Sequence, residues 1–487
     1  MPLLCRSHVG ATDWADESGM RILVWFRGKD LRVSDHLPLW MASRGSELLP
    51  LFVLDPYFFR PRRARRIPHR MQFLLESIDA LRMNLARCGA PLLLVSGASV
   101  AVVPEIVRRL RIDRVLAQRW AEPLGRERDR RIGEAIDVPF ELHDGETLMS
   151  LGSLRSSSGR PYETYTPFSN ALQKVLRVAV PLPAPKRLRA LAHDLVSEPL
   201  PTLAELGIAR NPALPRGGER AGRQRLAAFL QGGLDRYRVA RDRLDEAATS
   251  RLSADLKFGT LSARTVYGAV SSSAGADAQR FIAELFWREF THSTLHDQPE
   301  LLERAFRQSY DDGPWLEGGK TADAWASGQT GIPVVDAAAR QLLHEGFVHN
   351  RARMIAAAFL TKHLRQHYRV GERHYLRHLV DGDAAQNNFG WQWSAGCGVG
   401  AQPYFRVMNP VTQAERFDPD GEYVRRWIAP LRRLPREYVH QPWQAPSGVL
   451  AAAGVRLGID YPLPIVDLQT ARAEYLSLAR SVFRREP

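Results

Sequence analysis

Short apolar runs alternate with amphipathic stretches over the first 150 residues. The apolar runs are 21–26, 48–54, 91–95, 114–117 and 138–143. Between them, segments such as 70–87 and 101–111 place apolar residues at helical spacing. Continuous apolar runs indicate strands buried on both faces, and such strands alternate with helices in a parallel sheet. The pattern predicts an α/β domain with a doubly wound parallel sheet over residues 20–150.

The rest of the chain has two further parts. Residues 151–225 carry Pro, Gly and Ser clusters in a basic background, which is typical of a connecting linker on the surface. From 226 to 487 helical periodicity dominates, which predicts an all-α domain. Its predicted helices include 279–296, 333–346 and 349–368, and its predicted loops include 382–390 and 394–403. Residues 1–19 contain acidic residues and no apolar core, so we do not interpret them as a signal peptide. They are either a disordered extension or the product of a start codon assigned upstream of Met20.

The charge balance adds a question about partners. The 487 residues include 67 Lys and Arg against 53 Asp and Glu, a formal net charge of +14. This excess is expected of a protein from a GC-rich genome, whose codons favour arginine. It is equally expected of a protein that binds nucleic acid. No apolar run approaches the roughly 20 residues that cross a bilayer, and the three dispersed cysteines give no zinc or disulfide pattern. We expect a cytoplasmic protein that binds no membrane.

Two segments of the helical part combine polar groups that bind ligands. In 249–259, hydroxyl groups and Arg251 stand at an expected helix start, a composition that suits a phosphate or a plain helix cap. In 281–290, Glu284, Trp287 and Arg288 fall within one helical turn. A carboxylate and an indole there could read and stack a nucleobase. The alternative is a core tryptophan beside a Glu284–Arg288 surface ion pair.

Two more segments concentrate unusual side chains. In 346–364, Asn350, Arg353 and Met354 share one helical face. Two interpretations are open: the face contacts a ligand, or it is a polar cluster at a helix end. In 379–410, the Asp381-x-Asp383 pair lacks the further oxygen ligands of a calcium or magnesium site, so we expect no metal. An Asp paired with Arg353 explains these acidic residues at least as well as a metal site does. The aromatic residues that follow, Trp391, Trp393 and Tyr404, stand among glycines and are typical of a stacking surface for a ring system.

The order of these segments resembles the photolyase/cryptochrome family. The chain contains TSRLSADLKFG, ELFWREF, WASGQTGIPVVDAAARQL, HNRARM, DGDAAQNNFGWQW and FRVMNPVTQAERFDPDGEYVRRW, in that order. The resemblance covers roughly 20–445 and is nearest to the bacterial class I enzymes for cyclobutane pyrimidine dimers. It implies FAD in the helical domain and light-driven electron transfer from reduced FAD to a dimer in UV-damaged DNA. A cryptochrome-like photoreceptor and a (6–4) photolyase stay open as alternatives, and we expect a monomer.

The resemblance assigns a role to individual residues. Those implied to hold the FAD phosphates and ribityl chain are Tyr237, Thr249, Ser250, Arg251, Leu252 and Ser253. An Arg353–Asp381 pair would lie beside the isoalloxazine, Asp383 would bond the flavin edge and Asn387 would face N5. Those implied to contact the lesion or its flanking phosphates are Glu284, Trp287, Arg288, Asn350, Arg351, Met354, Trp393 and Arg406.

The chain departs from the family at three places. The route by which electrons reach the flavin corresponds to Trp391, Tyr368 and Trp315, with tyrosine where the family usually has tryptophan. Phe347 also replaces a usual tryptophan. Where the folate-binding members carry an Asn-Glu pair, this chain has Leu124 and Gly125. A second, antenna chromophore therefore stays unidentified, with a folate, a deazaflavin or none left open.

Overall fold

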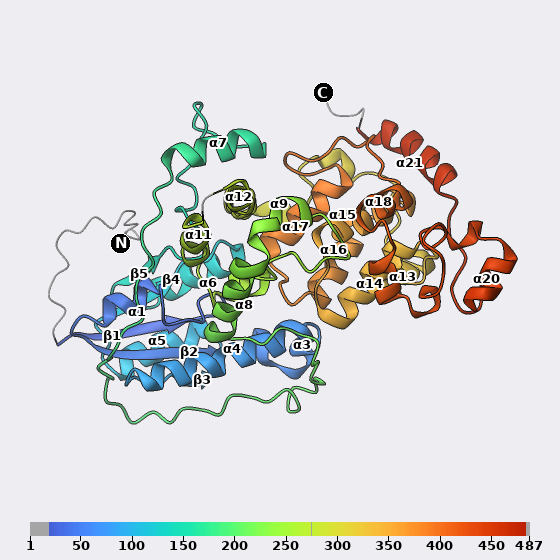
Figure 1. Cartoon of the computed structure of the whole chain (residues 1–487). Coiled ribbons are helices and arrows are strands. Elements are labelled where there is room, and N and C mark those ends of the chain that lie inside the picture. The colour runs from blue at the N-terminus through green and yellow to red at the C-terminus, as the bar shows by residue number, and fades with distance from the viewer. Residues whose placement is uncertain (1–18, 274, 484–487) are drawn as a thin grey trace. The chain divides into compact units, whose positions relative to one another are not determined.

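The computed structural model describes residues 19–273 and 275–483 (Figure 1). The expectation for residues 1–18 therefore lies outside the described residues. The chain divides into two compact units, which we describe separately. Unit 1 holds the described residues up to Asp235 together with Ser250–Pro299, and unit 2 holds Arg236–Thr249 and the residues from Glu300. The domain boundaries at 150 and 225 stay predictions, because a division by compactness does not test where a functional domain ends.

Unit 1 contains a five-stranded parallel sheet. Its strands are β1 (Arg21–Phe26), β2 (Glu47–Leu54), β3 (Leu93–Ser96), β4 (Arg114–Gln118) and β5 (Phe140–His143). The strand order is β3-β2-β1-β4-β5, and every neighbouring pair is parallel. The order reverses between β1 and β4. The structure confirms the doubly wound α/β fold expected from the alternating pattern.

Helices cover both faces of this sheet because the strands are apolar on both sides. The other elements of unit 1 are α1 (Leu37–Ala42), α2 (Pro56–Phe59), α3 (Pro61–Ala64), α4 (Pro68–Arg87), α5 (Ser99–Arg109), α6 (Pro123–Glu134), α7 (Tyr165–Val175), α8 (Glu219–Gly232), α10 (Ser253–Phe258), α11 (Ala263–Ser271) and α12 (Ala276–Asp297). Leu23 and Trp25 of β1 pack with Val103 of α5 and Ile132 of α6 in one core. On the opposite face, α1 contacts β1 and β4.

The named elements of unit 2 are all helices or single helical turns among its described residues. Its elements are α9 (Tyr237–Ala240), η3 (Gln308–Tyr310), α13 (Lys320–Ser327), α14 (Pro333–Glu345), α15 (Asn350–Ala358), η4 (Phe359–His363), α16 (Tyr368–His378), α17 (Ala384–Ala395), α18 (Pro410–Phe417), α19 (Glu422–Trp427), η5 (Ala429–Leu431), η6 (Pro442–Gln444), α20 (Ser447–Ala453) and α21 (Leu468–Phe483). Two short turns, η1 (Leu234–Arg236) and η2 (Pro299–Leu302), fall at the unit boundaries. No helix among the described residues is long and apolar enough to cross a membrane.

Two predictions of secondary structure in unit 2 were wrong. The single helix expected over 349–368 is divided into α15, the π-helical turn η4 and the start of α16. The loop expected over 382–390 is mostly helix, because the Asp383 side chain accepts a hydrogen bond from the Gln386 N–H and starts α17. A capping carboxylate therefore outweighed the loop-like composition that follows it.

Candidate flavin and lesion site

An Arg–Asp pair fixes the start of α15 against the segment before α17. The His349 side chain caps α15 by accepting a hydrogen bond from the Arg351 N–H at 3.2 Å. One turn into the helix, Arg353 Nη2 lies 2.9 Å from an oxygen of the buried Asp381 carboxylate, and Arg353 Nε donates to the Val348 carbonyl. The pair expected from the sequence is present, and both partners are held in a fixed orientation.

The Asn387 amide has a defined direction. Asn387 is buried on α17, and its Nδ2 donates to the Glu372 carbonyl at 3.1 Å. Because the N–H2 side of the amide is held there, Oδ1 points elsewhere as an acceptor. A reduced flavin carries a proton on N5 and therefore needs an acceptor at that edge. This amide, the Arg353 guanidinium of the same unit and the carboxylate of Asp383 are donors and acceptors of the kinds that fit FAD.

Trp391 packs on a glycine of the neighbouring helix. A methyl group added at Gly371 of α16 would overlap the Trp391 indole. The rings of Tyr375 and Trp325 lie 5.1 and 5.8 Å from the Trp391 ring, measured between centroids. The sequence interpretation gave these three neighbours no role. A glycine inside a helical pattern was the available signal for Gly371, since glycine is retained there for a packing reason.

Tyr368 lies in an aromatic group with Trp315. The Tyr310 ring lies 5.7 Å from the Tyr368 ring and stacks on the Trp315 ring at 4.7 Å. Tyr368 is fully buried, and its hydroxyl has no hydrogen-bond partner among the described residues. Burial raises the pKa of Tyr368 well above its ordinary value. A phenol that cannot release its proton is hard to oxidise, so this environment opposes electron transfer through Tyr368.

The residues expected to hold the FAD phosphates fall in both units. Tyr237 and Thr249 belong to unit 2, where Tyr237 is buried at the start of α9. Ser250, Arg251, Leu252 and Ser253 belong to unit 1, where Ser253 begins α10. Arg251 has a left-handed backbone, with a φ of 55°. Such a φ is uncommon outside glycine and is concentrated at functional sites. Phosphate binding by these residues stays a prediction.

The loop after β1 fixes α10 in place. Gly259 ends α10 with a φ of 63°, and a methyl group there would overlap the Lys29 carbonyl. The buried Arg32 guanidinium donates to the Gly259 carbonyl at 2.9 Å. The end of α10 therefore has room only for glycine.

Helix α12 exposes a tryptophan that stacks on a tyrosine from the expected linker. The rings of half-buried Trp287 and Tyr165 are nearly parallel, with an interplanar angle of 5° and centroids 3.7 Å apart. Glu284 pairs with Arg280 at 3.0 Å. Arg288 is buried and donates to the Glu146 carbonyl at 2.6 Å. The alternative Glu284–Arg288 surface pair is therefore wrong, and Tyr165 is a neighbour that the sequence did not reveal.

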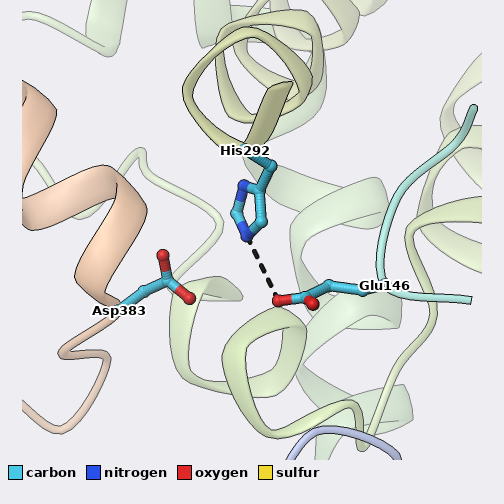
Figure 2. A group of neighbouring side chains, drawn as sticks. All are labelled: Glu146, His292 and Asp383. Atoms are coloured by element: carbon cyan, nitrogen blue, oxygen red, sulfur yellow. Dashed lines mark ion pairs between the residues drawn. The ribbon is translucent and has the colours of Figure 1, made fainter. Parts of the chain in front are cut away.

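Buried polar contacts anchor the opposite side of α12. The Nε2 atom of His292 lies 3.2 Å from Oε1 of the Glu146 carboxylate (Figure 2). Lys29, after β1, bonds the same Glu146 oxygen. Glu289 accepts hydrogen bonds from the N–H groups of Leu148 and Met149, and burial raises the pKa of Glu289. These contacts hold α12 rigidly, so Glu284 and Trp287 are presented on a fixed helix.

The remaining lesion residues lie in unit 2. Asn350 Nδ2 and Met354 Sδ are 3.9 Å apart on α15, which confirms their common face. Arg351 forms two 2.9 Å contacts with Asp242. Trp393 is half-buried on α17. Arg406 is exposed on a loop, and its backbone carbonyl accepts a hydrogen bond from Lys362 Nζ. Contact of these residues with DNA stays a prediction.

Side chains of unit 1 occupy the edge where an antenna group would be sought. Open α/β sheets bind ligands beyond the carboxyl ends of the strands, where the strand order reverses. Beyond β1 and β4, the Arg128 guanidinium lies 4.8 Å from the Trp25 ring and 4.6 Å from the Trp120 ring. Burial lowers the pKa of Arg128 to about 10. A methyl group at Gly125 would lie 2.7 Å from Trp120, so α6 also packs closely there.

Comparison with known proteins identifies the class to which this fold and site belong. Residues 22–186 match the family model described as DNA photolyase, and residues 281–481 match the FAD binding domain of DNA photolyase. A deoxyribodipyrimidine photo-lyase from Agrobacterium fabrum is 37% identical over 475 residues, covering 95% of this chain and 98% of the relative. The chain therefore belongs to the DNA photolyase family, and its helical part is an FAD-binding domain.

Three solved structures share the fold closely. A bacterial class III photolyase from Agrobacterium tumefaciens has a TM-score of 0.90 at 35% identity, covering 97% of this chain and 99% of that one. A Synechocystis cryptochrome has a TM-score of 0.86 at 27% identity, covering 95% and 99%. An archaeal photolyase from Sulfolobus tokodaii, described with two FAD molecules, has a TM-score of 0.81 at 28% identity, covering 95% and 100%. These matches do not test the class I assignment, which stays a prediction.

Proposed function

We propose that this chain repairs cyclobutane pyrimidine dimers in DNA with light absorbed by bound, reduced FAD. The observation that carries the proposal is the fixed Asn387 amide in the same unit as the Arg353–Asp381 pair. An acceptor for N5–H and a cation near the ring stabilise a reduced, anionic flavin. The family relatives named deoxyribodipyrimidine photo-lyase support the reaction. We further propose that the protein acts as a cytoplasmic monomer.

The residues of this chain bind and orient the dimer. FAD, when bound, supplies the electron that splits the dimer and takes it back afterwards. A dimer is poorly stacked, so turning it out of the duplex takes less free energy than turning out an intact base. Trp287 and Trp393 would then contact its apolar side, and Glu284 and Asn350 would bond its polar edges. Arg351 and Arg406 would contact the flanking phosphates.

The decisive experiment is blue-light repair of a duplex with one thymine dimer by chemically reduced protein. Chemical reduction removes any dependence on Tyr368, so the assay reports the lesion site alone. We expect light-dependent recovery of intact thymines. Absence of repair with FAD fully reduced would reject the proposal, and repair of a (6–4) duplex instead would establish the alternative lesion.

The stacking face of Trp287 gives a prediction about lesion recognition. Replacing Trp287 with alanine is expected to weaken binding of the dimer-containing duplex by about ten- to a hundred-fold. The reason is that stacking on an aromatic side chain contributes about 1–3 kcal/mol per base. Titration of damaged and undamaged duplexes measures both affinities. The undamaged affinity should stay constant, and Trp287→Phe should keep most of the lesion affinity. Equal weakening on both duplexes would show that Trp287 does not recognise the lesion.

The buried phenol of Tyr368 gives a prediction about photoreduction. Replacing Tyr368 with tryptophan is expected to accelerate photoreduction of oxidised FAD, because an indole loses an electron without first releasing a proton. In the unmodified protein we expect slow photoreduction, or a route through another residue such as Trp325. Flavin absorbance under continuous blue light measures the rate. An unchanged rate would remove Tyr368 from the route, and repair by chemically reduced protein serves as the control.

A further inference from the structure

The segment after β2 carries exposed positive charge that the flavin and lesion residues do not use. Between Asp55 and Glu76 the chain has six arginines and no acidic residue. The exposed members are Arg60, Arg62, Arg63, Arg65 and Arg66. We call residues 60–66 the basic segment. It consists of α3 and the residues that flank this short helix.

The five guanidinium groups have no acidic partners among the described residues. Their one aromatic contact is that of Arg63, which lies 5.1 Å from the Tyr57 ring. Other arginines of unit 1 are neutralised by carboxylates, such as Arg27 by Asp129 and Arg225 by Asp255. The basic segment therefore produces a local positive potential that nothing nearby in the sequence compensates.

The backbone that carries these arginines is already ordered. The helices α2, α3 and α4 each begin with a proline, which fixes the backbone φ at a helix start. Ala64 of α3 is fully buried and attaches the segment to unit 1. Binding a ligand then orders only side chains, which lowers the entropic cost of association.

We propose that the basic segment binds the phosphate backbone of duplex DNA, as a contact additional to the lesion residues. Guanidinium groups bind phosphate in a bidentate manner, and each neutralised phosphate releases counterions. Such a contact carries no information about sequence or damage, so it holds damaged and intact DNA equally. The partner is inferred from the proposed function, whereas the charge and exposure of the segment are independent of it. The five arginines of the basic segment then account for part of the net charge of +14 through DNA binding.

The test compares two chains with the same net charge. In the first, Arg60, Arg62, Arg63, Arg65 and Arg66 are all changed to glutamine. In the control, five dispersed exposed arginines of unit 1 are changed to glutamine, namely Arg82, Arg108, Arg131, Arg187 and Arg216. Affinity for an undamaged duplex is measured at several salt concentrations. We expect the basic-segment chain to bind about ten-fold more weakly at low salt. Its log-log salt slope should fall by about 2–3, because each lost phosphate contact removes about 0.9.

Several outcomes decide the matter. The control substitutions should change the salt slope by less than about 0.9, the value for one phosphate contact. The ratio of damaged to undamaged affinity should stay constant in both chains. Equal slopes for the two chains would overturn the proposal, as would an unchanged DNA slope with lost affinity for RNA. If the five-fold variant fails to fold, Arg62→Gln/Arg65→Gln is measured instead, with an expected slope change of about 1–2. Absence of repair by the unmodified chain would reject the proposed function without altering this comparison.

Discussion

An Arg353→Ala chain is expected to purify largely without FAD. The guanidinium is held by Asp381 and by the Val348 carbonyl, so its charge has a fixed place. Removing the arginine of a buried Arg–Asp pair leaves the aspartate carboxylate buried without a counter-charge, which costs about 3–5 kcal/mol. Because the Arg353 side chain is 29% exposed, we take about half of that value. Half of it, about 1.5–2.5 kcal/mol, corresponds to FAD binding that is weaker by about ten- to seventy-fold.

Arg351 provides the matched control. It lies two residues earlier on α15 and pairs with Asp242 at the same 2.9 Å distance. Arg351→Ala removes an ion pair of the same length, although the Asp242 carboxylate is 32% exposed and that of Asp381 only 5%. It is expected to retain FAD, because Arg351 is proposed to contact DNA. Titration of the two apoproteins with FAD, followed by flavin fluorescence, separates them. Equal loss of FAD from both chains would mean that α15 is merely destabilised. Full retention by Arg353→Ala would remove Arg353 from the flavin site.

The α/β part of the fold was predictable because its signal is local. Strands such as β1 are buried on both faces and therefore consist of continuous apolar residues, which no surface helix shows. The helical part gave a weaker signal. The division of the expected helix 349–368 depends on η4, where Lys362 is buried and donates to the carbonyls of Tyr404 and Arg406. That contact joins residues about 40 positions apart, so periodicity within one helix could not reveal it.

The site was predictable where neighbours share an element or a strong charge. The Arg353–Asp381 pair follows from two opposite charges in adjacent motifs, and the Asn350–Met354 contact follows from helical spacing. Stacking of Tyr165 on Trp287 joins α7 to α12, and only the folded chain brings these together. The burial of Arg288 could not be foreseen either, because its partner is a backbone carbonyl, which has no sequence signature.

Replacing Gly371 with alanine is expected to displace Trp391 and to destabilise unit 2. The added methyl group would overlap the indole, and both residues are buried between α16 and α17. Overpacking a filled core costs about 1–3 kcal/mol. Photoreduction should also slow markedly, because Trp391 stands on the predicted route by which electrons reach the flavin. Denaturant unfolding of the FAD-loaded protein measures the first effect, and flavin absorbance under blue light measures the second.

Gly390 shows whether these effects come from the indole contact. It immediately precedes Trp391 on α17 and is exposed. Apart from its two chain neighbours and the backbone of its own helix, no atom lies within 4 Å of an added methyl group. Alanine there should stabilise the helix by up to about 1 kcal/mol, since glycine is a poor helix former. Both substitutions add a methyl group near Trp391, but the one at Gly371 overlaps the indole and the one at Gly390 extends into open space. Stability changes of the same sign would contradict the packing argument. A Gly371→Ala chain that is destabilised yet photoreduced at the normal rate would remove Trp391 from the electron-transfer route.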